Sequence, residues 1–214
     1  MTDRYSAHGP EAEFEPGSRG RVLRNLKGIQ SVREMERCES KALLATTQHM
    51  IDITRDDQRF TSNDIRGMHR VWLSELYSWA GEYRQVNIAK GDFMFAAAAQ
   101  VPLLMTTFER GPLREFTPCR FESPDDQFKA LAVVHAELVL IHPFREGNGR
   151  SARLLSVLMG LQAGLPVLDF GGIKGDEKRR YIQAIHAALD RDYAPMTRIF
   201  HRVIDRTLQR EAKA

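Results

Sequence analysis

The chain has few cysteines, no long apolar run and no recognisable leader. Its 214 residues include two cysteines, Cys38 and Cys119, which lie far apart and match no zinc-site spacing. We therefore expect reduced thiols, as in a cytosolic protein, and no disulfide framework. The longest run of low polarity, residues 93–105, is shorter than the roughly 18–20 apolar residues of a membrane span. The N-terminus lacks the charged-then-apolar layout of a signal peptide. These absences predict a cytoplasmic protein with no membrane partner.

Charge of one sign is also scarce. Lys and Arg number 31 against 28 Asp and Glu, a formal net charge of +3, whereas a nucleic-acid-binding domain usually has a clustered basic face. We therefore predict no nucleic-acid partner, and a mildly basic chain suits a small polyanionic ligand such as a nucleotide. Apolar residues make up 43% of the chain, enough for a hydrophobic core without disulfides or a structural metal. Length and composition predict one large domain with at most a small appendage.

Helical spacing of apolar residues recurs along most of the chain. Residues 1–20 are rich in Gly, Pro, Ser and charge and predict an arm without regular structure. Residues 83–95 contain a short alternating stretch and the turn signal Gly91-Asp92, which predict a small hairpin. The expected helices are one from the capping box of Ser31 and Glu34 to the polar stretch 54–61, and others over 62–79, from 96 to a loop at Gly111-Pro112, over 124–140, from 148 to a stop at Gly164, and over 176–189 and 195–211. The predicted fold class is all-α: a compact helical bundle with a small β-hairpin.

The turn before the helix that starts at 148 has the chemistry of an anion site. Gly147 and Gly149 let backbone N–H groups approach a ligand closely. The unpaired N–H groups at the start of that helix attract phosphate, assisted by the helix dipole. Asn148 adds a side-chain amide donor, and the guanidinium groups of Arg150 and Arg153 can reach back toward anionic oxygens. This turn predicts phosphate binding.

A carboxylate and a histidine accompany the anion site. Glu146 would repel phosphate, and Mg²⁺ resolves the conflict because it binds one or two carboxylates together with substrate phosphates. His142 can accept a proton near neutral pH, so it could deprotonate an incoming hydroxyl. Phe144 is expected to point inward and anchor the loop. A base, a metal-binding carboxylate and a phosphate cradle together predict attack by a hydroxyl on a nucleotide phosphate.

Two competing interpretations of these residues are weaker. Residues 147–152 fit the G-x-G-x-x-A fingerprint of dinucleotide-binding folds, but that fingerprint needs a preceding strand, and a helix is expected there. His135 and His142 are seven residues apart, so a metal-binding pair is an alternative. We instead expect His135 to be a buried histidine with hydrogen-bonded ring nitrogens.

The segment HPFREGNGRSAR, which starts at His142, resembles the Fic-family signature H-P-F-x-[D/E]-G-N-G-R-x-x-R at every specified position. Further stretches that resemble the family are residues 22–29, 68–70, 77–84, 90–91 and 95. The resemblance spans about residues 20–205. It implies a single Fic domain over 21–214, with a core of about 62–205, an N-terminal helical extension and a C-terminal helix. It also implies transfer of AMP from ATP to a Ser, Thr or Tyr hydroxyl of a target protein.

The resemblance assigns a role to each matching position. His142 is the base, and Glu146 holds Mg²⁺ between the nucleotide phosphates. The residues implied in binding the ATP phosphates are Gly147, Asn148, Gly149, Arg150 and Arg153, the last at the γ-phosphate. The hairpin is implied to be a flap that aligns the target segment by strand-like backbone pairing. The flap residues expected to serve this purpose are Ile88, Lys90, Gly91 and Phe95.

The family also uses an inhibitory motif, [S/T]-x-x-x-E-[G/N], whose glutamate pairs with the second arginine. The best match here runs from Thr207 to Glu211 and departs at its last position, Ala212. Glu211 is alternatively a solvated residue near the chain end. In that case a separate antitoxin-like protein is an alternative inhibitor. The sequence leaves three roles open for the chain: the toxin of a toxin–antitoxin pair, a housekeeping regulator or an exported effector.

Other activities of the fold are also open. Some relatives transfer UMP, GMP or phosphocholine, and some transfer a phosphoryl group. The phosphorylating relatives resemble death-on-curing toxins and usually carry lysine where Gly149 stands, so Gly149 disfavours phosphorylation. A non-catalytic nucleotide-binding regulator is a further alternative, and the intact His142, Glu146 and arginines disfavour it.

Overall fold

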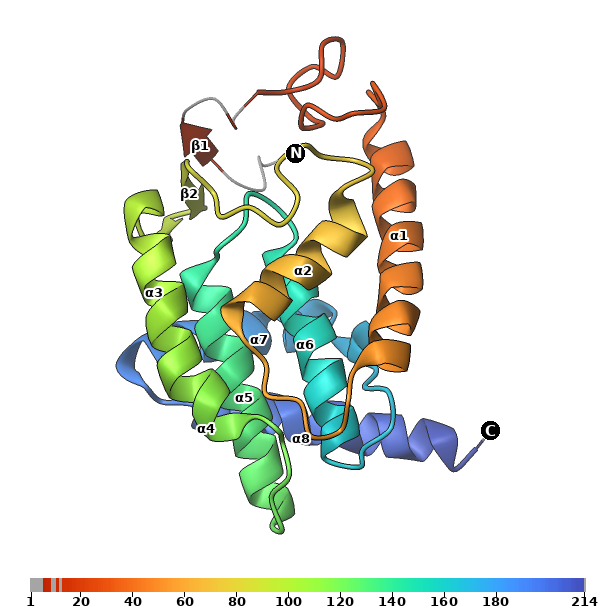
Figure 1. Ribbon diagram of the computed structural model, residues 1–214, viewed down its shortest axis with the longest axis vertical. Helices are drawn as coiled ribbons and strands as arrows, with labels where there is room; N and C mark the ends of the chain where they lie inside the picture. Colours follow the sequence, from red (N-terminus) through yellow and green to blue (C-terminus); the bar gives the residue numbers. More distant parts are fainter. Residues whose placement is uncertain (1–5, 9–10, 12, 214) are drawn as a thin grey trace. The chain divides into compact units, whose positions relative to one another are not determined.

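A computed structural model describes residues 6–8, 11 and 13–213 (Figure 1). The chain divides into two compact units. Unit 1 comprises Met1–Ile53, Ser62–Thr106 and Ile141–Asn148, and unit 2 comprises Thr54–Thr61, Thr107–Leu140 and Gly149–Ala214. The predicted division into an arm over 1–20 and one domain over 21–214 stays a prediction, because two clusters of contacts are not by themselves two independently folding domains.

Most of the described residues are helical. In the first half of the chain the elements are β1 (Ser6–His8), α1 (Val32–Ile53), α2 (Ser62–Leu73), β2 (Asn87–Lys90), β3 (Phe93–Met94), the short 3-10 helix η2 (Ala98–Gln100) and α3 (Val101–Phe108). In the second half they are η3 (Glu109–Leu113), α4 (Arg114–Phe116), α5 (Pro124–Ile141), α6 (Asn148–Gln162), η4 (Phe170–Gly172), α7 (Gly175–Ala187), η5 (Ala188–Asp190) and α8 (Ala194–Glu211). Among the described residues, none of these helices is both long and apolar enough to cross a bilayer.

The ends of several helices follow the sequence signals. The Ser31 hydroxyl accepts a hydrogen bond from the Glu34 N–H at 3.4 Å, which is one half of the predicted capping box at the start of α1. The helix ends at Ile53, before the polar stretch 54–61. Likewise α6 ends at Gln162 before Gly164, whose φ of 74° is the left-handed conformation expected of a glycine C-cap.

Two helix predictions were wrong. Helix α2 ends at Leu73, not near Trp79, because the apolar residues that follow are buried in successive turns: the N–H groups of Leu76 and Tyr77 both donate to the Leu73 carbonyl. The loop expected at Gly111-Pro112 is a π-helical turn, in which the Arg114 N–H donates to the Glu109 carbonyl. This wider turn accommodates a proline, which has no N–H to contribute.

The predicted hairpin is present as β2 and β3, with Gly91 at φ 57° in its turn. It belongs to a three-stranded sheet of order β1-β2-β3, in which the outer strand β1 comes from the arm. Strand β1 pairs antiparallel with β2, with Ala7 opposite Ile88 (Figure 1). The expectation that the arm lacks regular structure was therefore wrong for Ser6–His8, and for residues 1–5, 9–10 and 12 it lies outside the described residues.

The core of unit 1 joins the N-terminal extension to α1, α2 and the turns after α2. Its buried residues are Val22, Ile29, Met35, Trp72, Leu73, Leu76, Tyr77 and Ala80. Glu39 of α1 is buried in this core, where its backbone carbonyl accepts from the Trp72 indole N–H at 2.9 Å and its carboxylate accepts from the Tyr77 hydroxyl at 2.7 Å. These bonds fix α2 against α1. Helix α2 also contacts the loop between α5 and α6, through Trp72 and His69.

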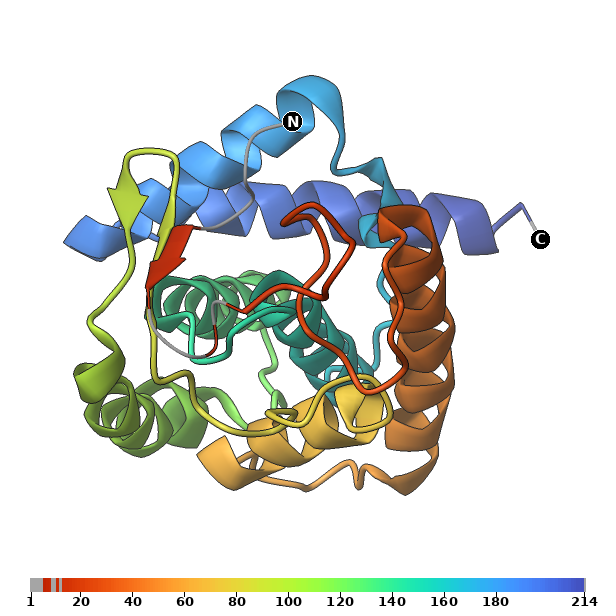
Figure 2. The ribbon, with the colours of Figure 1, turned by 90° about the horizontal axis from the view of Figure 1, so that it is seen from above.

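In unit 2, His135 of α5 is buried as predicted and connects α5 to α6 and α7 through its two ring nitrogens. Its Nδ1 lies 3.0 Å from the Ser156 hydroxyl of α6 and its Nε2 lies 2.7 Å from the Tyr181 hydroxyl of α7. Because Ser156 donates its own hydrogen to the Ala152 carbonyl, its oxygen accepts from Nδ1–H, and Nε2 accepts from Tyr181. The network is satisfied by a neutral imidazole. Helices α7 and α8, both blue in Figure 2, pack against each other in the same unit.

The neutral His135 predicts a loss of stability in acid. Burial, with a smaller contribution from the Arg153 charge, lowers the pKa of His135 from 6.5 to about 3. Between these values the unfolded chain binds a proton that the folded chain does not, so the free energy of unfolding falls as pH falls from about 6.5 toward 3. Between pH 7 and pH 5 we expect this histidine alone to remove about 2 kcal/mol, measured by urea unfolding.

The comparison is between His135→Gln and His49→Gln. His49 is exposed on α1, so His49→Gln should keep the wild-type dependence on pH. His135→Gln should be less stable at pH 7 but lose less of its stability on acidification. An identical loss between pH 7 and pH 5 in wild type and His135→Gln would contradict the assignment.

Candidate active site

The predicted loop joins α5 to α6, and Asn148 begins α6 as expected. Residues His142 to Asn148 lie in unit 1, and the chain enters unit 2 at Gly149. His142 has a positive φ of 52°, and Gly147 has a φ of 85°. A positive φ in a non-glycine residue stores backbone strain, and such strain is found most often at functional sites.

Gly147 is required by its surroundings as well as by its φ. A Cβ at this position would stand 2.7 Å from Cζ3 of Trp72, a ring that is 1% exposed, and 3.5 Å from Nε2 of His69. Glycine was expected here to let a ligand approach the backbone closely. In the structure the group that approaches the Gly147 backbone closely is the Trp72 ring. The turn is pressed against α2, and any side chain at 147 would push it away.

Asn148 closes the loop on itself. The Phe144 N–H donates to Asn148 Oδ1 and Asn148 Nδ2 donates to the Phe144 carbonyl, both at 2.8 Å. These bonds position the turn. The expectation that this side-chain amide serves as a phosphate donor stays a prediction. Phe144 is fully buried, as predicted, and stacks on the His69 ring with 3.8 Å between centroids.

His69 of α2 holds the Glu146 backbone. Its Nδ1 accepts from the Gly81 N–H at 2.8 Å, so its hydrogen is on Nε2, which lies 3.1 Å from the Glu146 carbonyl and donates to it. The Glu146 carboxylate is half-buried, and one of its oxygens accepts from the Gly147 N–H at 3.0 Å. Helix α2 therefore holds the Glu146 backbone, and the Gly147 N–H orients the carboxylate.

The donor set around Glu146 fits Mg²⁺ bound together with a nucleotide. Among the described residues no three His, Cys, Asp or Glu side chains group together to hold a metal by themselves. A single oriented carboxylate is what Mg²⁺ needs when phosphate oxygens and waters supply the remaining ligands. Glu146 would hold the ion in that case, and the ion would neutralise charge on the phosphates.

His142 is covered by the flap. It is 4% exposed, and its ring stacks on Phe95 with 3.7 Å between centroids. Phe95 in turn packs with Val86 and Ile88 in the small core of the hairpin. One face of the imidazole is therefore covered by Phe95, and the flap lies over the proposed base.

Arg84 fastens the flap to the His142 loop. Its side chain is 1% exposed and donates to three backbone carbonyls, those of His142 at 2.7 Å, Val86 at 2.8 Å and Ala96 at 2.5 Å. Burial lowers the pKa of Arg84 to about 10, opposed by the charge of Glu11. The guanidinium remains charged at neutral pH and ties both ends of the hairpin to the carbonyl of His142.

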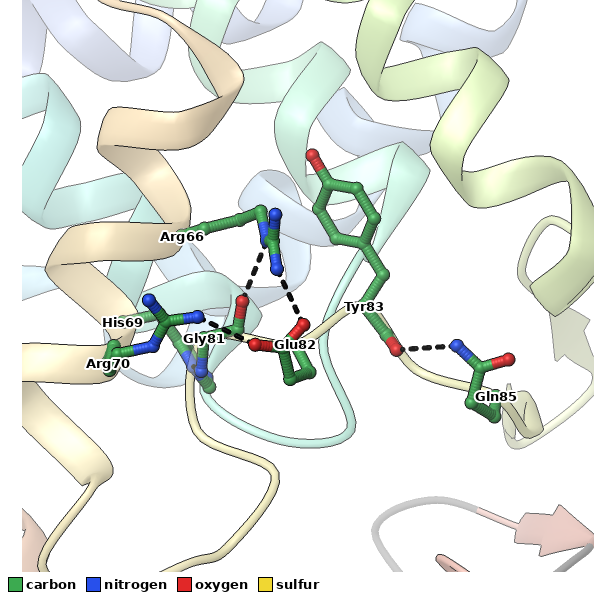
Figure 3. A network of polar contacts seen from close by, with 7 residues as sticks. All are labelled: Arg66, His69, Arg70, Gly81, Glu82, Tyr83 and Gln85. Carbon is green, nitrogen blue, oxygen red and sulfur yellow. Dashed lines mark hydrogen bonds and ion pairs between the residues drawn. The ribbon is translucent and has the colours of Figure 1, made fainter.

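The chain between α2 and the flap is clamped to α2 by a polar network (Figure 3). Arg66 donates to the Gly81 carbonyl at 2.9 Å and to the Glu82 carboxylate at 2.5 Å, and Arg70 donates to the other oxygen of Glu82 at 2.6 Å. The Arg66 guanidinium also lies 5.1 Å from the centre of the Tyr83 ring. This clamp sets where the flap begins, next to the backbone that His69 holds.

The flap residues predicted from the sequence fall into two groups. Ile88 and Phe95 are buried, whereas Lys90 and Gly91 are exposed at the hairpin turn. Pairing of a target with this hairpin stays a prediction.

The residues predicted to bind phosphate beyond Asn148 lie in the first turns of α6. Arg150 and Arg153 are half-buried. The Arg153 Nη1 lies 3.7 Å from the place a Cβ of Gly149 would occupy, so the Arg153 side chain reaches back toward the start of its helix as expected. Gly149 itself has open space around that place apart from this contact.

The predicted inhibitory residues lie on α8. Thr207 is buried and its hydroxyl donates to the Val203 carbonyl at 2.8 Å and accepts from the Asp169 N–H at 3.0 Å. Glu211 is the last residue of α8 and is exposed. These contacts give Thr207 a structural role and agree with Glu211 as a solvated residue, and an inhibitory role of the pair stays a prediction.

Sequence reasoning missed the residues that support the loop. The specific contacts of His69 and Arg84 connect positions 77 and 58 residues apart. Arg145, at the unspecified position of the signature, is buried and donates through Nε to the Glu11 carbonyl at 2.9 Å. The burial of polar residues at 69, 84 and 145 is their common feature, and a single sequence gives no signal for it.

The fold and the site together define a class: a mainly helical protein in which a histidine-led, glycine-rich turn opens a helix and a small hairpin covers the histidine. Residues 59–159 match the model of the Fic/DOC family, and the chain belongs to this family.

The relatives in sequence include the probable protein adenylyltransferase Fic of Escherichia coli (strain K12), 26% identical over 95% of this chain and 96% of that protein. The probable protein adenylyltransferase y4lH of Sinorhizobium fredii is 28% identical, over 86% of this chain and 91% of that protein. These relatives are named as protein adenylyltransferases, and the chain is classed with such nucleotidyltransferases.

Solved structures confirm the predicted fold class, an all-α Fic fold with a small hairpin. The Fic domain of a VirB-translocated effector from Bartonella sp. AR 15-3 has a TM-score of 0.73 at 20% identity, with 92% of this chain and 93% of that chain covered. BepC of Bartonella tribocorum, solved with bound AMPPNP, has a TM-score of 0.68 at 23% identity, with 85% of this chain and 91% of that chain covered.

Proposed function

We propose that this chain transfers AMP from ATP to a Ser, Thr or Tyr hydroxyl of a target protein. One observation carries the proposal: a single loop bears His142, an oriented Glu146 and the glycine turn that opens α6. Relatives of nearly the same length are named protein adenylyltransferases, which supports the same reaction class here.

The ATP phosphates would bind at the start of α6. The backbone N–H groups of Asn148 and Gly149 are at the end of the helix where the dipole favours anions. The Gly147 N–H, which donates to the Glu146 carboxylate in this structure, would turn to the phosphates when the nucleotide binds. Arg153, which reaches back toward Gly149, would contact the terminal phosphate, and Arg150 would contact the phosphates nearer the sugar. Mg²⁺ bound by Glu146 would supply charge neutralisation to the triphosphate.

In the proposed reaction a target hydroxyl attacks the α-phosphorus of ATP. The new bond joins the hydroxyl oxygen to that phosphorus, the bond to the bridging oxygen of the β-phosphate breaks, and pyrophosphate leaves. His142 takes the hydroxyl proton, and the backbone N–H groups with both arginines stabilise the charge that develops on the phosphate oxygens. Arg84 donates to the His142 backbone carbonyl and so fixes the backbone that carries the imidazole.

The target would be aligned by the flap, through backbone pairing with the hairpin. A cytoplasmic location, and a partner protein that inhibits the enzyme as an antitoxin does, belong to the same proposal. Glu211 is exposed on α8, which favours a separate inhibitor over inhibition by the chain's own helix.

The proposal is tested with ATP labelled on the α-phosphate, incubated with the protein, Mg²⁺ and a bacterial lysate. We expect labelled protein bands that excess unlabelled ATP suppresses and that UTP, GTP or CDP-choline leaves largely unchanged. Stronger suppression by one of the other donors than by the same concentration of unlabelled ATP would show that the site prefers that donor. Binding of ATP without any labelled protein would favour the non-catalytic regulator.

A further inference from the structure

The outer edge of the flap is occupied by the chain itself. Strand β2 is the central strand of the sheet: β3 covers one edge, and β1 covers the other with Ser6 opposite Ala89 and His8 opposite Asn87. A strand edge is where an extended polypeptide adds to a sheet through main-chain hydrogen bonds. The arm therefore occupies the β2 edge of the hairpin, one of the two edges at which a target segment could add.

The arm is also attached beside the proposed active loop. The Glu11 carboxylate accepts from the Gln85 N–H at 3.1 Å, and the Glu11 carbonyl accepts from the buried Arg145 at 2.9 Å. Arg145 stands at the position that the signature leaves unspecified, so the signature itself does not predict this contact. Glu11 thus joins the arm to the flap on one side and to the His142 loop on the other.

The flap that the arm holds is closed over the base. Phe95 lies against His142, and Arg84 ties the Val86 and Ala96 carbonyls to that of His142. A two-stranded hairpin alone is only marginally stable. Strand β1 adds main-chain hydrogen bonds at the β2 edge and so stabilises the hairpin in this closed position.

We propose that the described part of the arm, Ser6–His8 with Glu11, is an intramolecular inhibitor that competes with target segments for the edge of β2 and keeps the flap closed on His142. The inference rests on the proposed function, which supplies the target. A tethered segment has an effective concentration in the millimolar range, so an extended target must displace it. Because β1 is only three residues long, that displacement is within reach of a longer pairing segment.

The first experiment asks whether the arm occupies the edge, independently of catalysis. Successive N–H groups of a strand point to opposite sides. One of the N–H groups of residues 7 and 8 therefore faces β2, and the double variant Ala7→Pro/His8→Pro removes it. The matched control, Thr2→Pro/Asp3→Pro, carries the same prolines before β1. Hydrogen exchange of the amides in residues 87–90 should be about 10-fold faster in the first variant and unchanged in the control.

A synthetic peptide with the sequence of residues 4–12, carrying a fluorophore, measures the same edge by anisotropy. It should bind the Ala7→Pro/His8→Pro variant at least about 10-fold more tightly than the wild type, whose edge is filled. Glu11→Ala removes the carboxylate contact with Gln85 and the negative charge near Arg84, and we expect a smaller change in the same direction. If amide exchange and peptide binding are the same in the wild type, in Ala7→Pro/His8→Pro and in Glu11→Ala, the claim that the arm occupies the β2 edge is wrong.

The second experiment measures transfer from ATP labelled on the α-phosphate to lysate proteins. Release of the arm should raise the initial rate about 10-fold in Ala7→Pro/His8→Pro and leave the Thr2→Pro/Asp3→Pro control at the wild-type rate. A released edge with an unchanged or lower rate would overturn the inhibitory role. If no variant transfers label, the proposed function fails and the inhibitory role with it, while exchange and peptide binding still decide whether the arm fills the edge.

Discussion

Replacing His142 with alanine lowers the rate of AMP transfer by a factor of about 10² to 10⁴, the usual contribution of a general base. The imidazole is the proposed proton acceptor of the loop, and the His142 carbonyl accepts a hydrogen bond from Arg84 at 2.7 Å. Removing the ring leaves Glu146, the glycine turn and both arginines in place, so the affinity for ATP should change by less than about threefold. Initial rates with labelled ATP and calorimetric titration of ATP provide the two readouts.

The matched control is His49→Ala, which removes an exposed imidazole on α1. It should transfer AMP at the wild-type rate. A His142→Ala protein that transfers AMP as fast as His49→Ala would remove His142 from the mechanism. A joint loss of ATP binding and transfer would mean that the ring shapes the nucleotide site and is not its base.

Replacing Gly147 with alanine should lower both stability and ATP binding. The residue has φ 85°, and a new Cβ would stand 2.7 Å from the buried Trp72 ring. Strain at a left-handed position and overpacking against a fixed ring each cost about 1–3 kcal/mol, so we expect the free energy of unfolding to fall by about 2–6 kcal/mol. Urea unfolding measures the loss, and calorimetry at a temperature where the variant is folded measures ATP binding.

Gly149→Ala is the informative counterpart. A Cβ there meets only the Arg153 side chain at 3.7 Å, an ordinary contact, and alanine favours a helix over glycine by about 0.5–1 kcal/mol. The variant should therefore be as stable as the wild type or slightly more stable. We nevertheless expect ATP affinity to fall about 10-fold, because the methyl group occupies the approach to the backbone donors. Unchanged ATP affinity in Gly149→Ala would exclude residue 149 from the phosphate site.

Local signals in the sequence predicted the elements that local interactions determine. The start of α1 at the Ser31 cap, the end of α6 near Gly164 and the turn at Gly91 each depend on a few neighbouring residues. The same reasoning failed after Leu73, where apolar residues at helical spacing are buried in turns, because packing in the core of unit 1 overrides the periodic pattern.

The motif of the candidate site could be predicted from the sequence, but the long-range contacts that hold the site in place could not. The order of His142, Glu146, Gly147 and Gly149 indicates the chemistry by itself. The contact of Arg145 with Glu11 joins residues 134 positions apart, and a pairing over such a separation leaves no local pattern. Strand β1 is similar, since three residues of mixed polarity have no strand signal until β2 offers them an edge.

The most direct test of the account is the fate of the two ends of ATP. Wild-type protein is incubated in parallel with ATP labelled on the α-phosphate and with ATP labelled on the γ-phosphate, together with Mg²⁺ and lysate. We predict that the α-label becomes attached to protein and that the γ-label is recovered in pyrophosphate. Attachment of the γ-label to protein, without the α-label, would show phosphoryl transfer and contradict the account.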